Sequence, residues 1–288
     1  MGRTAPIAVI IPTYKRGMAV LSVLERVALC DPKPTEVWVH VDLADGLLER
    51  ELNQSFPEVR VLLSQTRVGP GGGRHRCLLS CNTPYAVSFD DDSYPVDADF
   101  FARVEQLFSQ HPKAAIFGAS IWHRHEPTKG RNKMLVRVPN YVGCGHAIRL
   151  AAYRQVRGYL PLPRAYGMEE SDLSLQLFAA GWQIYASGEL RVFHDTDLNH
   201  HQSADVTAAV IANVGLYAFL NYPINAWGWG ILQLANKVAY CIRRGRLRGV
   251  CTGLLSIPRN CYCNRKYRKP VTRQTLRKFL HFNRSGAI

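Results

Sequence analysis

Residues 206–288 contain no acidic side chain, although they carry 14 of the 36 Lys and Arg residues of the chain. Residues 1–205 hold 22 residues of each sign, so the whole excess of +14 lies in the tail. A segment with charge of one sign binds an anionic partner or faces an anionic surface. The tail is also rich in aromatic and aliphatic residues, which argues against a merely solvated basic tail.

A cysteine framework is also lacking. The eight cysteines include no CxxC pair, and Cys261 and Cys263 lie too close in sequence for an ordinary disulfide. This spacing excludes a zinc module or a disulfide-rich secreted domain and predicts reduced thiols in a cytosolic compartment. The first apolar run, Ile7–Ile11, is too short for the core of a signal peptide and no cleavage site follows it, so we expect no secretion signal.

Between Val206 and Asn236 the sequence lacks charge of either sign. Pro223 and several Asn residues interrupt this stretch, which disfavours a single membrane-spanning helix. We therefore expect two helices that break at Tyr222–Pro223, followed by basic, partly amphipathic sequence. Internal repeats and low-complexity segments are absent from the sequence as well.

The first half of the chain alternates short apolar runs with helical patterns. β-Branched and aromatic residues predict strands over 7–11, 36–42, 59–63 and 85–89. Helical periodicity predicts helices over 18–29, 47–54 and 74–80. This alternation predicts an α/β fold with a parallel, doubly wound sheet, whose ligands bind at the carboxyl ends of the strands. Polar residues stand at these ends: Pro12-Thr13-Tyr14, Asp42 and Asp90-Asp91-Asp92.

The second half continues with further elements of both kinds. The pattern predicts a helix over 97–111, a strand near 114–122, the segment 140–148, a helix from about 170 to 180, and a strand over 183–193. That last strand ends at His194. A lone His is often structural, but its strand-end position makes a metal ligand the second interpretation.

Three adjacent carboxylates follow the apolar run Val87–Phe89. Asp90, Asp91 and Asp92 repel one another unless a cation balances them. Mg²⁺ and Mn²⁺ prefer oxygen ligands and bind through one or two carboxylates together with substrate phosphates. A solvated acidic turn is the alternative, because Ser93-Tyr94-Pro95 follows, but the strand-end position favours the metal.

Gly-Pro-Gly-Gly-Gly at 69–73, followed by Arg74, opens the third predicted helix. Glycine lets backbone N–H groups approach an anion, and a helix N-terminus favours negative charge. The run lacks the GxxxxGK[ST] pattern, which excludes a kinase-like P-loop. A plain flexible turn is the alternative interpretation.

Acidic residues open the predicted helix after residue 168. Glu169, Glu170 and Asp172 favour the positive end of the helix dipole, so capping alone would explain them. Because Gly167 indicates an exposed turn beside them, a general base is the second interpretation.

These segments together resemble the family 2 glycosyltransferases of the GT-A fold over roughly residues 5–200. Ile-Pro-Thr-Tyr-Lys-Arg at 11–16 is similar to the first-strand nucleotide-binding motif of that family. Val-Asp-Leu-Ala-Asp at 41–45 is similar to its second-strand motif, whose Asp reads the base. Arg67-Val-Gly69 with Gly73-Arg74 resembles its third element.

The resemblance continues through the second half. Phe-Asp-Asp-Asp at 89–92 is similar to the DxD metal motif of the family, and Gly-Cys-Gly-His-Ala-Ile-Arg at 143–149 resembles its glycine-led segment near donor and acceptor. The segment 167–176 resembles its Glu-Asp-x-Asp-Leu motif. Glu170 stands where the family has the Asp that acts as general base. Leu220-Asn-Tyr-Pro223 looks like the helical tails of bacterial members that act on polysaccharide or lipid-linked acceptors.

The resemblance implies a domain plan and site residues. A GT-A catalytic domain with a doubly wound mixed sheet is expected over 1–205, with a nucleotide-binding half (1–95) and an acceptor half (96–205), before a basic, membrane-associating helical extension (206–288). Glu170 is implied as general base. A metal is implied at Asp90, Asp92 and His194. The implied donor-nucleotide contacts are Pro12, Thr13, Tyr14, Arg16, Asp42, Arg67, Gly69, Arg74, Asp90 and Asp91. The implied sugar and acceptor contacts are Gly143, Cys144, Gly145, Glu169 and Asp172.

The implied reaction is an inverting transfer of a hexose or deoxyhexose from a UDP- or dTDP-sugar, dependent on Mn²⁺ or Mg²⁺, in polysaccharide or glycolipid synthesis. We expect a cytoplasmic enzyme at the inner face of the cell membrane, bound to anionic lipid through 206–288 and to no nucleic acid. Three alternatives stay open: a nucleotidyltransferase on sugar phosphates, a nucleic-acid-binding protein that uses the basic tail, and an inactive sugar-binding module.

Overall fold

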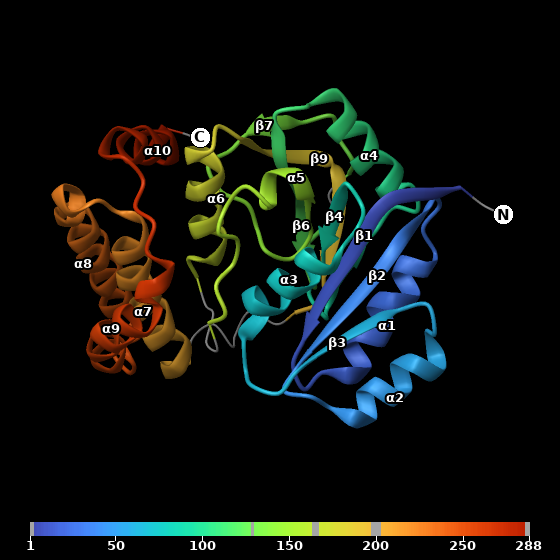
Figure 1. Ribbon diagram of the computed structural model, residues 1–288, viewed down its shortest axis with the longest axis horizontal. Coiled ribbons are helices and arrows are strands. Elements are labelled where there is room, and N and C mark those ends of the chain that lie inside the picture. The colour runs from blue at the N-terminus through green and yellow to red at the C-terminus, as the bar shows by residue number, and fades with distance from the viewer. Residues whose placement is uncertain (1–2, 128–129, 163–166, 197–202, 286–288) are drawn as a thin grey trace. The chain divides into compact units, whose positions relative to one another are not determined.

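The computed structural model describes residues 3–127, 130–162, 167–196 and 203–285. Within these residues nine strands form one sheet in the order β3-β2-β1-β4-β8-β6-β9-β5, with β7 paired to β9 (Figure 1). The strands are β1 (Thr4–Thr13), β2 (Lys33–Asp42), β3 (Arg60–Ser64), β4 (Tyr85–Ser88), β5 (Ser93–Pro95), β6 (Ala114–His123), β7 (Leu135–Arg137), β8 (His146–Arg149) and β9 (Gln183–His194).

The sheet is mixed. β1 runs parallel to β2 and β4, β2 to β3, and β6 to β9. β8 is antiparallel to β4 and β6, and β5 and β7 are antiparallel to β9. The α/β fold is confirmed, and the strand–helix alternation of the first half predicted its parallel part. The strands β5 and β7 were not predicted, because three residues are too few to show the alternation of buried and exposed side chains.

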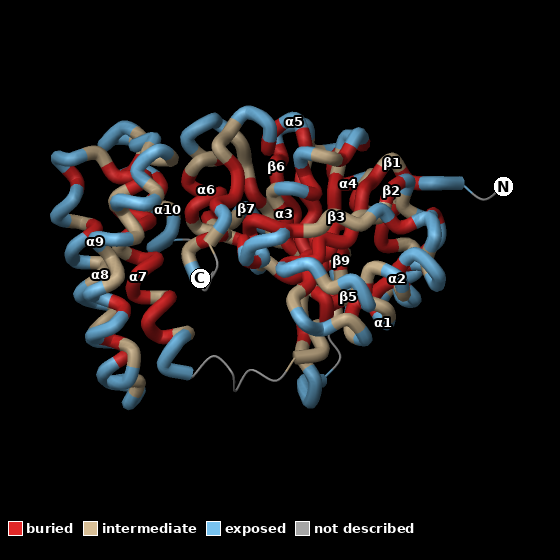
Figure 2. The backbone as a smooth tube through the Cα atoms, turned by 60° about the horizontal axis from the view of Figure 1, so that its bottom comes forward, coloured by how far each residue is buried: buried red, intermediate tan, exposed pale blue. Residues whose placement is uncertain are grey.

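Helices cover both faces of the sheet. Ile7, Val9 and Ile11 of β1 share one core with α1 (Gly17–Ala28), α2 (Gly46–Ser55) and α4 (Phe100–Gln110). Because side chains alternate along a strand, the intervening residues of β1 point to the other face, where α3 (Gly69–Ser80) lies (Figure 1). Figure 2 shows the strands buried and the outer sides of α1 and α2 exposed. The packing of helices on both faces of the sheet fixes the strand ends that carry the predicted site.

The glycine run belongs to α3 itself. The helix begins at Gly69 rather than at Arg74, so the predicted start was wrong. A Cβ on Gly73 would lie 2.6 Å from His40 Nδ1 and 3.1 Å from Pro12 Cβ, and one on Gly72 would lie 2.7 Å from Val68 Cβ. The lack of side chains therefore lets the first turns of α3 pack tightly on β1 and β2. The sequence placed this run before the predicted helix 74–80, because glycine disfavours helix interiors.

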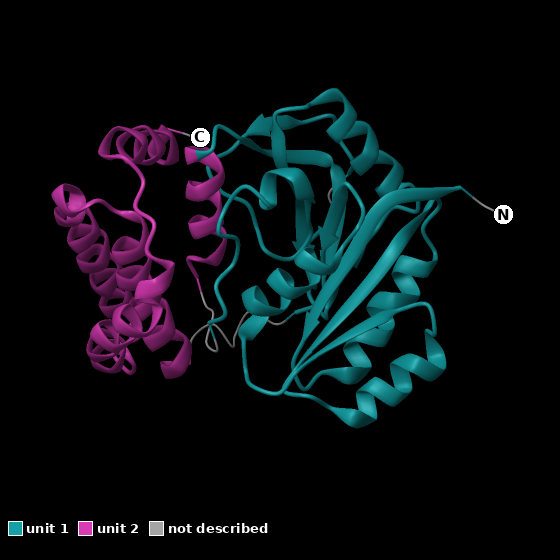
Figure 3. Cartoon of the chain, in the orientation of Figure 1, with its two compact units in different colours: residues 1–163, 180–196 teal, residues 164–179, 197–288 magenta. Residues whose placement is uncertain are grey.

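The chain divides into two compact units (Figure 3). The sheet unit comprises residues 1–163 and 180–196, and the helical unit comprises residues 164–179 and 197–288. The sheet unit also contains the short helix α5 (Leu150–Tyr153). The helical unit thus takes in α6 (Glu169–Ala179), which carries the acidic motif, together with the chain after residue 196.

The helical unit is built around α7 (Ala204–Asn221), most of whose side chains are buried. The remaining elements are η2 (Ile224–Ala226), α8 (Trp227–Arg243), α9 (Val250–Asn264), η3 (Arg265–Tyr267) and α10 (Arg273–Ser285). The predicted break at Tyr222–Pro223 is confirmed, because α7 ends at Asn221. Of the described helices, α7 alone is long and apolar enough to cross a membrane, but 67% of its apolar window is buried inside the fold, as in a core helix.

Candidate active site

The three carboxylates after β4 meet cations from two other segments. Arg16 Nη1 lies 2.8 Å from Asp92 Oδ2 and 3.1 Å from Asp91 Oδ1. Thr13 Oγ1 donates to Asp91 Oδ2 at 2.9 Å, and the Arg74 guanidinium pairs with Asp90. The end of β1 and the first turns of α3 thus converge on the acidic cluster, as expected for strand ends at one edge of a sheet.

His194 at the end of β9 joins this cluster. Its Nε2 lies 3.1 Å from Asp92 Oδ1, and its Nδ1 lies 3.4 Å from Cys144 Sγ. Ligand atoms of Asp90, Cys144 and His194 all lie within 4.8 Å of one another. Carboxylate oxygens and an imidazole nitrogen are donors that a divalent cation accepts, and Arg16 already balances Asp91 and Asp92 as a cation would. The donor set therefore fits a divalent metal.

The cluster shifts the protonation of its members. Burial raises the pKa of Asp91 to about 6, against the opposing charge of Arg16. Burial also works to raise the pKa of Asp92, but the hydrogen bond and charge of His194, together with Arg16, outweigh it and lower that pKa. The same contact with Asp92 overcomes burial at His194 and raises the pKa of its imidazole. Asp92 and His194 therefore stabilise each other's charged forms.

Asp42 supports the start of α3. Its two carboxylate oxygens accept hydrogen bonds at 2.8 Å from the backbone N–H groups of Val68 and Gly69. The carboxylate of Asp42 thus takes the position at this helix start where the sequence suggested an anion. Asp42 was predicted to read the nucleotide base, and in the structure it fixes the segment that carries Arg67 and Gly69.

Tyr14 and Arg67 form a second group beside this edge. The Arg67 guanidinium lies 4.3 Å from the centroid of the Tyr14 ring, and Lys15 Nζ lies 5.5 Å from the same centroid. Both cations contact the aromatic ring in the geometry of a cation–π pair. The structure thus brings together Tyr14 and Arg67, two of the predicted nucleotide-binding residues.

The glycine-led segment packs next to the acidic cluster. Gly145 has a positive φ of 90°, and a Cβ there would lie 2.8 Å from Val192 Cγ2. Its N–H donates to Ser88 O at 2.9 Å, and the side chain of Ser88 accepts from Arg74 Nε at 3.0 Å. Gly143 O accepts from His146 Nδ1 at 2.8 Å. The tight turn explains why glycines flank Cys144, whose side chain is held against His194.

The acidic motif of α6 lies in the helical unit. Glu169 and Asp172 are buried and Glu170 is half-buried. Asp172 accepts hydrogen bonds from Gln176 Nε2 at 2.9 Å and from Asn221 Nδ2 at 2.6 Å. Asp172 is thus engaged by structural partners, whereas Glu170 is the more exposed carboxylate of the helix start. Asn221 belongs to the segment Leu220–Pro223, for which the sequence predicts no contact with the acidic motif.

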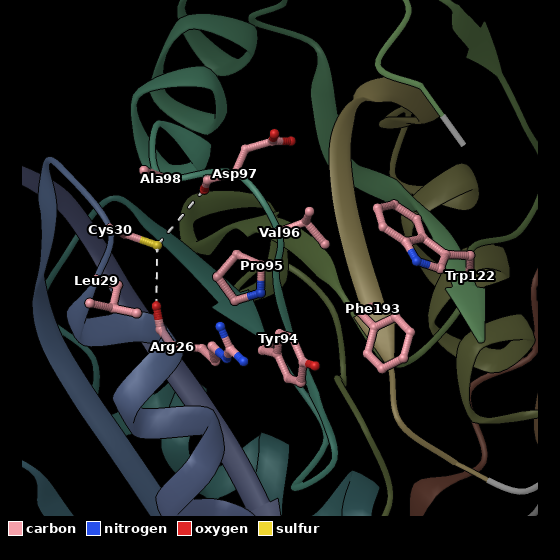
Figure 4. A pocket seen from close by; sticks show the side chains of 10 residues that line it. All are labelled: Arg26, Leu29, Cys30, Tyr94, Pro95, Val96, Asp97, Ala98, Trp122 and Phe193. Atoms are coloured by element: carbon pink, nitrogen blue, oxygen red, sulfur yellow. Dashed lines mark hydrogen bonds between the residues drawn. The ribbon is translucent and has the colours of Figure 1, made fainter. Parts of the chain in front are cut away.

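A separate hollow of about 370 Å³ lies on the sheet unit (Figure 4). Tyr94, Trp122 and Phe193 line it from three neighbouring strands, with the Arg26 guanidinium 5.3 Å from the Tyr94 ring centroid. Because successive residues of a strand point to opposite faces, the hollow lies on the face away from His194. It is distinct from the acidic cluster.

Comparison with known proteins identifies a family. Residues 5–157, more than half of the chain, match the family described as Glycosyltransferase like family 2. No curated protein sequence matches the chain significantly.

Solved structures show the same fold. GalNAc-T7, solved with UDP, GalNAc and Mn²⁺, is 12% identical with a TM-score of 0.61, and the match covers 77% of this chain but only 49% of that one. The mannosyltransferase PcManGT from Pyrobaculum calidifontis, in complex with GDP-Man and Mn²⁺, is 12% identical with a TM-score of 0.59, over 99% of this chain and 86% of that one. TarS of S. aureus is 14% identical with a TM-score of 0.52, over 72% of this chain and 39% of that one. The chain thus spans about half the length of the first of these proteins. The family match and the fold together place this chain among the family 2 glycosyltransferases.

Proposed function

We propose that this chain transfers a sugar from a nucleotide-diphosphate sugar to a hydroxyl of a glycan or lipid-linked acceptor, with inversion at the anomeric carbon. The observation that carries the proposal is the convergence of Asp90–Asp92 with Arg16, Arg74 and His194 at one edge of the sheet. GalNAc-T7 and PcManGT, which share the fold, were solved with UDP or GDP-Man and with Mn²⁺. Family membership favours this activity over nucleotidyl transfer.

A divalent cation, Mn²⁺ or Mg²⁺, would be held by Asp90, Asp92 and His194. When bound, it would offset the negative charge that builds on the departing diphosphate. Arg16 would exchange its contacts with Asp91 and Asp92 for a phosphate, because its side chain is half exposed and an arginine fork binds phosphate oxygens in pairs. Arg74 is buried and fixed to Asp90, so it would orient that carboxylate from the side of α3.

The nucleotide would lie beside the Tyr14 ring, whose face already contacts Arg67. Asp42 would act through the segment that it holds, by keeping Arg67 and Gly69 at the edge of the site. We favour a UDP- or dTDP-sugar, as the resemblance implies.

Glu170 would be the general base. Its carboxylate would take the acceptor hydroxyl proton as that oxygen forms a bond to the anomeric carbon and the bond to the diphosphate breaks on the opposite side. The in-line geometry is what inverts the configuration. A cavity of about 380 Å³ in the helical unit is lined by Met168 and Ser171, which flank the two glutamates, and by side chains of α7, α8 and α10. This cavity is our candidate for the acceptor.

The helical unit would also bind the inner face of the cell membrane. Exposed apolar side chains recur along α8, with Ile231 at 68% and Ile242 at 50% exposure, and Leu255 of α9 is 81% exposed. The segment between α8 and α9 adds Arg244, Arg246 and Arg248. Apolar burial together with attraction to anionic lipid is the chemistry of peripheral membrane attachment.

The test combines binding with turnover. A screen of UDP-, dTDP- and GDP-sugars, with Mn²⁺ or Mg²⁺, would measure release of nucleoside diphosphate; pyrophosphate release from a nucleoside triphosphate and a sugar phosphate would indicate a nucleotidyltransferase instead. We expect Asp92→Asn to abolish metal-dependent binding of the nucleoside diphosphate. Glu170→Gln should keep that binding and lower turnover about 10²–10⁴-fold.

Glu169→Gln is the matched control for the base. It removes the neighbouring charge of the same helix start. Because Glu169 is an implied sugar contact, this variant should raise KM but lower kcat less than Glu170→Gln does. Normal turnover of Glu170→Gln together with an inactive Glu169→Gln would place the base one residue earlier. Product stereochemistry, read by NMR of the new glycosidic bond, would reject inversion if the donor configuration were kept.

A further inference from the structure

Cys144 is a thiol among hard ligands. Its side chain is 4% exposed, and its Sγ lies 3.4 Å from His194 Nδ1. The Sγ, a nitrogen of His194 and an oxygen of Asp90 are mutually within 4.8 Å. Acidic clusters that bind Mn²⁺ or Mg²⁺ need no sulfur, since these ions prefer oxygen donors. The position of Cys144 therefore calls for an explanation of its own.

The tautomer of His194 favours Nδ1 as a ligand. Nε2 lies 3.1 Å from Asp92 Oδ1, so in the neutral ring Nε2 carries the proton and donates it to Asp92. This leaves the lone pair on Nδ1 facing the thiol. A metal-bound histidine in proteins almost always donates its other ring N–H to a carboxylate or carbonyl, which fixes the ring and raises its basicity. Asp92 and His194 already have this arrangement.

The spacing also fits a metal between sulfur and nitrogen. Zinc–sulfur and zinc–nitrogen bonds of about 2.3 and 2.0–2.1 Å at a tetrahedral angle separate the two donor atoms by about 3.6 Å. The observed separation of Sγ and Nδ1 is 3.4 Å. Small shifts of the Cys144 and His194 side chains would therefore let a metal ion bind between Sγ and Nδ1. Asp90 would be the third ligand and a water molecule the fourth.

We propose that Asp90, Cys144 and His194 Nδ1 form a binding site for thiophilic divalent cations, Zn²⁺ or Cd²⁺ being the models, and that its occupation excludes the cation used for donor binding. Thiolate donors select such ions over Mn²⁺ and Mg²⁺. Exclusion follows because Asp90 and His194 serve both sites, and this part alone rests on the proposed function. On binding, the Cys144 thiol proton passes to solvent as the metal–sulfur bond forms, and no oxidation or reduction occurs.

The experiment measures the metal–sulfur bond directly, without nucleotide or acceptor. The reference protein carries Cys251→Ser, Cys261→Ser and Cys263→Ser, which remove the thiols of α9 that lie at or near the surface. Titration with CdCl₂ should give a thiolate-to-metal charge-transfer absorption that saturates at one ion per chain. Adding Cys144→Ser should abolish the absorption, whereas adding Cys77→Ser, a fully buried thiol on α3, should leave it unchanged.

Competition gives the second readout. Free Mn²⁺, followed by its electron paramagnetic resonance signal, should be released from the reference protein by Zn²⁺. In Cys144→Ser the Zn²⁺ needed should rise at least about tenfold, while Mn²⁺ affinity stays the same. An absorption that persists in Cys144→Ser, or none at saturating Cd²⁺ in the reference protein, would overturn the proposal. Absent Mn²⁺ binding with a Cys144-dependent Cd²⁺ absorption would instead count against the metal dependence of the proposed transfer.

Discussion

Asn221 Nδ2 donates a hydrogen bond of 2.6 Å to Asp172 Oδ1, and both side chains are buried. The bond joins the end of α7 to the first turn of α6. Apolar contacts reinforce it, because Leu175 of α6 shares a core with Tyr217 and Tyr222 beside Asn221. The tail is therefore part of the structure that holds the acidic motif, and changes in the tail should reach that motif.

Replacement of Asn221 tests this link. Asn221→Ala leaves a buried carboxylate with one donor fewer, so we expect unfolding of the helical unit to need about 1–3 kcal/mol less free energy. Urea unfolding followed by circular dichroism would measure it. Asn264→Ala is the control, because its bond to Asn260 O on α9 is only partly buried. Equal losses in the two variants would show that the Asp172 contact adds nothing specific.

The glycines of α3 give the second prediction. A methyl group on Gly73 would meet the buried His40 and Pro12 at 2.6 and 3.1 Å, so Gly73→Ala should lower the free energy of unfolding by about 1–3 kcal/mol. The control is Gly46→Ala at the start of α2, where no atom lies within 4 Å, and a change within about 0.5 kcal/mol is expected. Thermal unfolding would compare them. A Gly73→Ala protein as stable as wild type would mean that α3 shifts to accommodate the methyl group at little cost in free energy.

These glycines show where sequence reasoning works and where it stops. Strand periodicity and the strand-end rule were enough to expect Thr13 at the same edge as the acidic cluster, because parallel strands end at one edge. Arg16 and Arg74 were named only through the resemblance to family 2 glycosyltransferases, as nucleotide contacts. The early start of α3 could not be predicted, since packing against His40 overrides the low helix propensity of glycine. The contact of Cys144 with His194 joins residues far apart in the chain, and it depends on the pairing of β6 with both β8 and β9.

His40 predicts a pH dependence of stability. Burial lowers its pKa from 6.5 to about 4, and its Nε2 lies 2.6 Å from Ser64 Oγ. The folded state disfavours the charged ring, so this contribution is fully present above pH 6.5 and is lost as pH falls toward 4. The slope from this group is at most about 1.4 kcal/mol per pH unit.

Variants of His40 and Ser64 separate the contribution of His40 to the pH dependence of stability from that of other groups. The raised pKa of Asp91 acts in the opposite direction in acid, so wild type alone does not report His40. We expect His40→Asn to lose less stability than wild type between pH 6.5 and 4.5 in urea unfolding. Ser64→Ala, which removes the partner but keeps the imidazole, should retain the wild-type slope. Parallel curves for wild type and His40→Asn would contradict the assignment.

Membrane attachment is tested on the helical unit by separate apolar and basic changes. Ile231 and Leu255 are exposed apolar side chains of α8 and α9. Four arginines lie at the end of α8 or between the two helices, and three of them are replaced together in the test: Arg243, Arg244 and Arg248. Each basic residue at an anionic surface contributes about 1 kcal/mol, so replacing the three by Gln should weaken binding roughly a hundredfold. Ile231→Glu with Leu255→Glu should weaken it further at high salt, where the apolar contribution dominates.

The measurement is co-sedimentation of the full chain with vesicles of phosphatidylglycerol and phosphatidylcholine, against phosphatidylcholine alone, at low and high salt. Leu47→Glu on α2 is the control, since that side chain is 74% exposed on the sheet unit and should not affect binding. Equal sedimentation of wild type and the triple Gln variant would refute attachment through the basic segment. Ending the chain at residue 205 is a poorer test, because it also removes Asn221 and exposes the apolar face of α6. We expect that truncated chain to aggregate, so its loss from vesicles would report unfolding as much as lost attachment.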